Sequence, residues 1–136
     1  MAKLKILAAS DIHSDKGAAK RLAEMAEKYD VDFVVLAGDL TFFDESSKGI
    51  VGPFVEKGKK VIFVNGNHDS LATSQMVTRK YGAQHLQFYP YKVGDVGFFG
   101  CGGAQMFVGP TVLSEDEIFD YIFISQNYCT RKRGAR

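Results

Sequence analysis

The chain contains three short apolar segments at a constant spacing, and each is followed directly by polar residues. The segments are residues 4–9, 32–37 and 60–64. Asp11 follows the first and Asp39 the second, 28 positions apart, and Asn67 follows the third at the same separation from Asp39. One strand and the helix after it take up about 30 residues. The repeat therefore predicts strands that all end at the same edge of one parallel sheet.

Helical patterns between these segments favour an α/β fold. One apolar helical face is formed by Leu22, Met25, Ala26 and Tyr29, at the i, i+3, i+4, i+7 spacing of an amphipathic helix. Residues 71–81 predict a second helix, and a weaker one over residues 46–57 contains Pro53, which is expected to break or restart it. Strands that alternate with helices in this way are typical of a parallel sheet covered by helices.

The pattern changes in the second half of the chain. Residues 87–93 and 96–100, joined by Gly94-Asp95, predict a β-hairpin. Ser114 to Glu117 has the form of a capping box, which predicts the start of a short helix. Residues 121–125 are apolar and rich in β-branched and aromatic residues, so we expect a last strand there.

Three groups of polar residues follow the first three predicted strands. They are Asp11-x-His13, Gly38-Asp39 and Gly66-Asn67-His68-Asp69. Ligands of open α/β sheets bind outside the carboxyl edge, where these groups would meet. Each group alone could be a turn or a helix cap, but three in order at one strand period favour a metal site. Oxygen and imidazole ligands suit Mn²⁺, Zn²⁺ or Fe.

These motifs resemble the signature of the calcineurin-like metallophosphoesterases, over roughly residues 4–117. The resemblance implies a β-sandwich flanked by helices, here incomplete at its C-terminal side, and a site for two divalent metal ions. Asp11 and His13 would bind the first metal, Asp39 would bridge both, and Asn67 would bind the second. We expect Mn²⁺, with Fe, Ni²⁺ and Zn²⁺ as alternatives.

The same resemblance assigns the catalytic residues. His68 would contact the substrate phosphate and protonate the leaving oxygen or stabilise the transition state, and Asp69 would hold the His68 ring in orientation. The expected reaction is hydrolysis of phosphodiesters or small phosphomonoesters by a metal-bound hydroxide. Phe42 and Phe43, just after Asp39, could line a pocket or stack on a base, but we expect them to pack in the core.

The family pattern also supplies late histidines, and here the chain departs from it. Its three histidines are His13, His68 and His85. The Gly-His-x-His motif is absent, and Gln126 stands where a histidine after the last predicted strand is expected. We expect His85 on the surface and one metal ion rather than two. The alternative is a catalytically impaired relative that binds a metal, phosphate or protein partner, and a third interpretation is a plain α/β binding domain.

Composition bears on domains, location and partners. We divide the chain into a domain over residues 1–125, which looks truncated or altered relative to the family, and a basic tail over residues 126–136. Cys101 and Cys129 form no Cys-x-x-Cys pair, which favours free thiols and a cytoplasmic location without a membrane segment. The tail gives weak support for nucleic-acid binding. Missing strands would uncover apolar sheet surface, so we expect a homo-oligomer.

Overall fold

The computed structural model describes residues 3–105 and 108–130. Its elements in chain order are β1 (Ile6–Ala9), α1 (Lys16–Lys28), β2 (Phe33–Ala37), α2 (Gly52–Glu56), β3 (Lys60–Val64), α3 (Leu71–Tyr81), β4 (Gln84–His85), β5 (Tyr91–Val93), β6 (Val96–Phe98) and α4 (Glu115–Thr130). Strands β1 to β4 form one parallel sheet in that order, and β5 and β6 form an antiparallel hairpin. The predicted α/β fold is confirmed.

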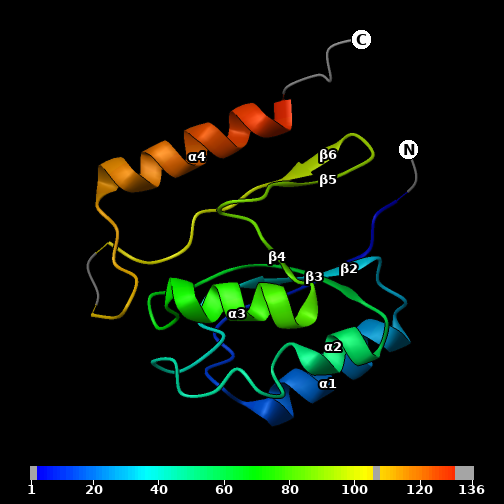
Figure 1. Ribbon diagram of the computed structural model, residues 1–136. Coiled ribbons are helices and arrows are strands. Elements are labelled where there is room, and N and C mark those ends of the chain that lie inside the picture. The colour runs from blue at the N-terminus through cyan, green and yellow to red at the C-terminus, as the bar shows by residue number, and fades with distance from the viewer. Residues whose placement is uncertain (1–2, 106–107, 131–136) are drawn as a thin grey trace.

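The parallel sheet lies between helices α1 to α3 and the β5–β6 hairpin, and helix α4 lies beyond the hairpin (Figure 1). Helices α1, α2 and α3 cover one face, where Phe54 and Val77 pack with strand residues such as Leu36 and Phe63. Three alanines on α1 are fully or almost fully buried, namely Ala19, Ala23 and Ala26. Side chains this small let α1 lie close against its neighbours in the core.

The hairpin covers the other face of the sheet. The ring of Phe33 on β2 meets Tyr91 at 5.4 Å and Phe98 at 5.1 Å, both edge to face. Ile62 and Leu86 complete this second cluster. The two sheets thus form a small sandwich with helices on its outer side, as the family resemblance implied.

The predicted strand over residues 121–125 is wrong, because this segment lies inside helix α4. The Ser114 backbone N–H donates to the Glu117 carboxylate, and the Glu117 N–H donates back to the Ser114 hydroxyl, so the predicted capping box does start the helix. No glycine or proline interrupts residues 115–130. Gln126 therefore lies within a helix, and its alignment with a histidine that follows a strand is lost.

Other boundaries shifted by a few residues. Helix α2 is shorter than predicted and begins around Pro53, which lies in its first turn. Strand β4 was not predicted. Helix α4 continues across the expected boundary between domain and tail at residue 126, and the basic residues 131–136 lie outside the described residues. Among the helices that the structure describes, none combines the length and apolar character that crossing a membrane requires.

Candidate metal centre

The loops after β1 and β2 are joined backbone to backbone, which brings the first two motifs together. The Asp11 N–H donates to Gly38 O at 3.2 Å, and the His13 N–H donates to Asp39 O at 2.9 Å. Asp11, His13 and Asp39 all have φ between 46° and 53°. Non-glycine residues seldom adopt this left-handed conformation, and such strain concentrates at functional sites. The loops hold these three residues in a defined, unusual geometry.

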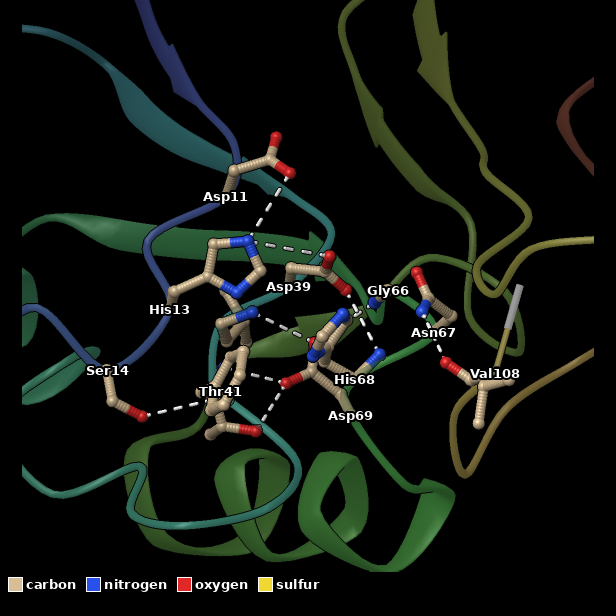
Figure 2. Close-up of polar contacts among 12 residues, drawn as sticks. Asp11, His13, Ser14, Asp39, Thr41, Gly66, Asn67, His68, Asp69 and Val108 are labelled. Carbon is tan, nitrogen blue, oxygen red and sulfur yellow. Dashed lines mark hydrogen bonds and ion pairs between the residues drawn. The ribbon is translucent and has the colours of Figure 1, made fainter.

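The three side chains converge at the carboxyl edge of the sheet (Figure 2). His13 Nε2 lies 3.7 Å from Asp11 Oδ1 and 3.8 Å from Asp39 Oδ2. One ligand atom from each residue can be chosen so that all lie within 4.8 Å of one another. The Asp39 side chain is mostly buried, whereas that of Asp11 is 66% exposed. Two carboxylates and an imidazole at this separation fit a divalent cation, which would be reached from the Asp11 side.

Asp39 also contacts the third motif. Its Oδ1 accepts a hydrogen bond from the His68 backbone N–H at 3.1 Å. A Cβ atom on Gly66 would lie 1.7 Å from Asp39 Oδ1 and 2.3 Å from its backbone nitrogen. Residue 66 must therefore be glycine for Asp39 to occupy this position.

Asn67 lies on the same β3 loop, next to the loop before α4. Its Nδ2 donates to Val108 O at 3.1 Å, and its backbone O accepts from the Thr111 N–H at 3.3 Å. The carboxamide oxygen is the atom that would serve a cation. The predicted role of Asn67 in binding a second metal stays a prediction.

The His68 ring is surrounded by other rings. Phe43 lies 4.2 Å from it between centroids, Phe42 5.2 Å and His13 5.1 Å. Its Nδ1 is buried without a hydrogen-bond partner. Ring packing rather than a hydrogen bond therefore orients His68. Phe42 and Phe43 are 45% and 47% exposed, so the expectation that they pack in the core is wrong.

The Asp69 carboxylate contacts the loops after β2 and β3, and its predicted role in orienting the His68 ring stays a prediction. Its carboxylate is buried and accepts four hydrogen bonds: from the backbone N–H groups of Leu40, Thr41 and Gly66, and from the Thr41 hydroxyl, at 2.7–3.0 Å. Both oxygens are thereby engaged with the loops after β2 and β3. Asp69 thus fixes the position of one motif relative to the other, and its catalytic role stays a prediction.

The loop before α4 supports the site, and sequence patterns gave no residue-level sign of this. The Thr111 hydroxyl donates to the Asp69 backbone O at 2.6 Å. A Cβ on Gly102 would lie 2.4 Å from Asn65 O, and one on Gly109 would lie 2.1 Å from Asn67 O. The only advance signal was the glycine content of this loop, which permits such close approach of two backbones.

His85 is buried, so its expected surface position is wrong. Its ring stacks on Phe63 at 4.8 Å, and its Nε2 lies 2.9 Å from Asn65 Oδ1. Burial lowers the pKa of His85 to about 4, against a smaller opposing effect of Asp69. A neutral ring donates from Nε2 to Asn65, whose Nδ2 in turn donates to Gly66 O. His85 therefore supports the β3 loop from beneath and is not a metal ligand of the site.

Comparison with known proteins decides the family. A family profile described as calcineurin-like phosphoesterase matches residues 4–131. The chain belongs to the calcineurin-like phosphoesterase family. This membership supports a divalent-metal-dependent phosphoesterase at the level of the family, and Asp11, His13 and Asp39 form a candidate ligand group for the metal.

Solved structures agree on the fold of this calcineurin-like phosphoesterase. The crystal structure of TT1561 of Thermus thermophilus superposes with a TM-score of 0.75 at 15% sequence identity, over 93% of this chain and 64% of that chain. At this identity the likeness shows the fold alone. The chain spans less than two thirds of the length of that protein. A search of curated proteins returned no match.

Proposed function

We propose that the chain hydrolyses phosphodiesters or small phosphomonoesters with a divalent cation held by Asp11, His13 and Asp39. The observation that carries the proposal is the convergence of these three ligands within 4.8 Å, with His68 beside them. A structural cap or turn does not require two carboxylates and an imidazole to face one another. A phosphoryl group bound to a cation at this position would lie next to the His68 ring.

The residues of the site have separate roles in the proposed reaction. A bound divalent cation supplies Lewis-acid polarisation of the phosphoryl oxygens. Water attacks phosphorus and gives up one proton to solvent while the bond from phosphorus to the leaving oxygen breaks. A proton on His68 Nε2 passes to that oxygen, and solvent then restores the proton to His68. Asp69 contributes indirectly, because it fixes the loop on which His68 lies.

We propose Mn²⁺ as the cation, with Fe, Ni²⁺ or Zn²⁺ as alternatives, and one ion per isolated chain. The support is the donor set, because carboxylate and imidazole suit these metals. Among the described residues, a single group of three such side chains stands close enough to hold an ion. We also propose a cytoplasmic protein, in keeping with the free thiol of Cys101.

The test is hydrolysis of a chromogenic phosphodiester by metal-stripped protein, with and without added Mn²⁺. Turnover is expected only with the metal, and Asp39→Asn is expected to lower it at least ~100-fold, as removal of a central electrostatic group does. A folded wild-type protein that shows no turnover at millimolar Mn²⁺ would contradict the enzyme assignment.

The second candidate is a catalytically impaired relative that binds metal or phosphate. The high exposure of Asp11 favours it, because an open ligand holds an ion weakly. Isothermal titration separates the two functions. Binding of Mn²⁺ and phosphate without turnover, both lost in Asp39→Asn, would establish the binding function instead.

A further inference from the structure

Two adjacent phenylalanines beside the candidate site are almost half exposed to solvent. Phe42 and Phe43 are 45% and 47% exposed, although they follow the buried Leu40 and Thr41 directly. Their rings meet edge to face, 5.0 Å apart at 88°. Exposing two large aromatic side chains side by side forgoes the burial that each would gain in the core.

The backbone of the turn that keeps both rings exposed has strained dihedral angles. Phe43 has φ 47° and Asp44 φ 59°, which are strained values for side chains of this kind. The Asp44 N–H donates to His68 O, and the Asp44 carboxylate accepts from the Ser70 N–H at 2.9 Å. On the other side, the Phe42 N–H donates to the Ser14 hydroxyl at 3.2 Å. The turn is thus fixed at both ends to loops of the site.

The rings lie on the His68 side of the metal ligands. Phe43 is 4.2 Å from the His68 ring, and Phe42 is 5.2 Å from it and 5.9 Å from His13. His68 is the residue that would protonate the leaving oxygen. The part of the substrate attached to that oxygen would therefore extend over Phe42 and Phe43.

We propose that Phe42 and Phe43 bind a flat aromatic part of the leaving group, either a nucleobase or an aryl ring. The inference rests on the proposed phosphoesterase function and specifies its substrate class. Stacking of one base on an aromatic side chain, judged by its removal, corresponds to roughly a ten- to hundred-fold change in affinity. Phe42 and Phe43 would then select aromatic phosphate esters over aliphatic ones of similar size.

The experiment compares a phenyl phosphodiester with its cyclohexyl counterpart, using Phe43→Leu, which keeps an apolar side chain but removes the flat ring. For each ester the ratio of kcat/KM between variant and wild type is measured, so intrinsic reactivity cancels. We expect about a ten-fold or greater loss for the phenyl ester and less than three-fold for the cyclohexyl ester. Phe99→Leu, which changes an exposed phenylalanine directly after β6, is the matched control and should leave both ratios near one.

Equal losses on both esters would overturn the inference while leaving the phosphoesterase function intact. If wild-type protein hydrolyses neither ester, the proposed function fails, and binding then decides the inference separately. Titrations with AMP, phenyl phosphate and ribose 5-phosphate should show weaker binding to Phe43→Leu for the first two only. AMP alone affected would identify a nucleobase, and phenyl phosphate alone an aryl ring. Unchanged binding of all three would refute the aromatic site.

Discussion

At the scale of single residues, the site depends on a glycine, Gly66, whose lack of a side chain leaves room for Asp39. Gly66 does not have a positive φ, so its backbone conformation is open to other residues. What it provides is room, because Asp39 lies across the space that a Cβ would fill. The more buried carboxylate of the ligand group is thus positioned by a glycine that has no side chain.

Gly66→Ala is expected to destabilise the protein by about 2 kcal/mol or more, since the new methyl group would overlap Asp39 Oδ1 and the backbone beneath it. Displacement of Asp39 should also weaken Mn²⁺ binding. Urea unfolding and metal titration measure the two effects. Gly17→Ala in α1 is the control, because its Cβ would meet only the ends of flexible side chains and should stabilise the helix by up to about 1 kcal/mol. Equal stability of Gly66→Ala and wild type would refute this account.

His85 predicts a dependence of stability on pH. Its pKa is about 4 in the folded protein, against an ordinary value of 6.5. Between these values the unfolded chain binds a proton that the folded protein does not, so stability is full above pH 6.5 and falls as the pH drops to 4. The shift corresponds to a loss of about 3 kcal/mol.

Urea unfolding at several pH values between neutrality and the folded-state pKa measures this loss. His85→Gln can still donate to Asn65 but cannot titrate, so its stability should fall less steeply over the same window. Parallel curves for the variant and the wild type would show that His85 does not titrate as described.

At the scale of elements, a buried carboxylate joins the ends of two strands. Asp69 follows β3, yet three of its four hydrogen bonds go to Leu40 and Thr41 after β2. The two loops that carry Asp39 and His68 are therefore held at a fixed separation. Loss of this connection would misplace both motifs together.

Asp69→Asn should destabilise the protein by about 3 kcal/mol, because an amide NH₂ would face N–H donors that now meet an oxygen. Urea unfolding measures the loss. Asp15→Asn, at the N-terminus of α1, changes the same group at a position where asparagine caps a helix equally well, so it should have little effect. If both variants lose the same small amount, the four hydrogen bonds of Asp69 contribute less than proposed.

The first three strands and the helices α1 and α3 could be predicted from the sequence, because long periodic segments and polar strand ends carry a strong local signal. Residues 121–125 could not, because a short run of aromatic and β-branched residues fits a strand or a helix equally well. The position of His85 depends on its contacts with Phe63 and Asn65, about 20 residues away in the sequence. The exposure of Phe42 and Phe43 depends on a turn with strained backbone angles. Local patterns do not contain such contacts.

At the scale of the whole molecule, helix α4 leaves large apolar side chains exposed to solvent. Phe119, Ile122 and Phe123 lie on one face of the helix, within about 100° around its axis, whereas Ile124 lies outside this face. The rings of Phe119 and Phe123 stack on each other at 6.4 Å and remain 69% and 57% exposed. Contiguous apolar surface of this kind marks sites of association.

We propose that the chain forms a homo-oligomer through this face of α4. Light scattering should give a mass above that of one chain for the wild type. Phe119→Glu combined with Phe123→Glu should shift the mass toward the monomer, whereas Asp120→Asn on the same helix should not. A monomeric wild type at tens of micromolar would contradict the proposal.

All three candidate metal ligands come from one strand–helix–strand unit, the segment from β1 to the loop after β2, whereas His68 belongs to the next unit along the chain. The proposed ligands and the proposed proton donor therefore lie in different stretches of sequence, although Gly66 and the His68 N–H of the second stretch hold the Asp39 carboxylate of the first in place. A metal site moved between proteins of this fold would therefore need both stretches, because the segment from β1 to Asp39 alone lacks the loop that positions the Asp39 carboxylate.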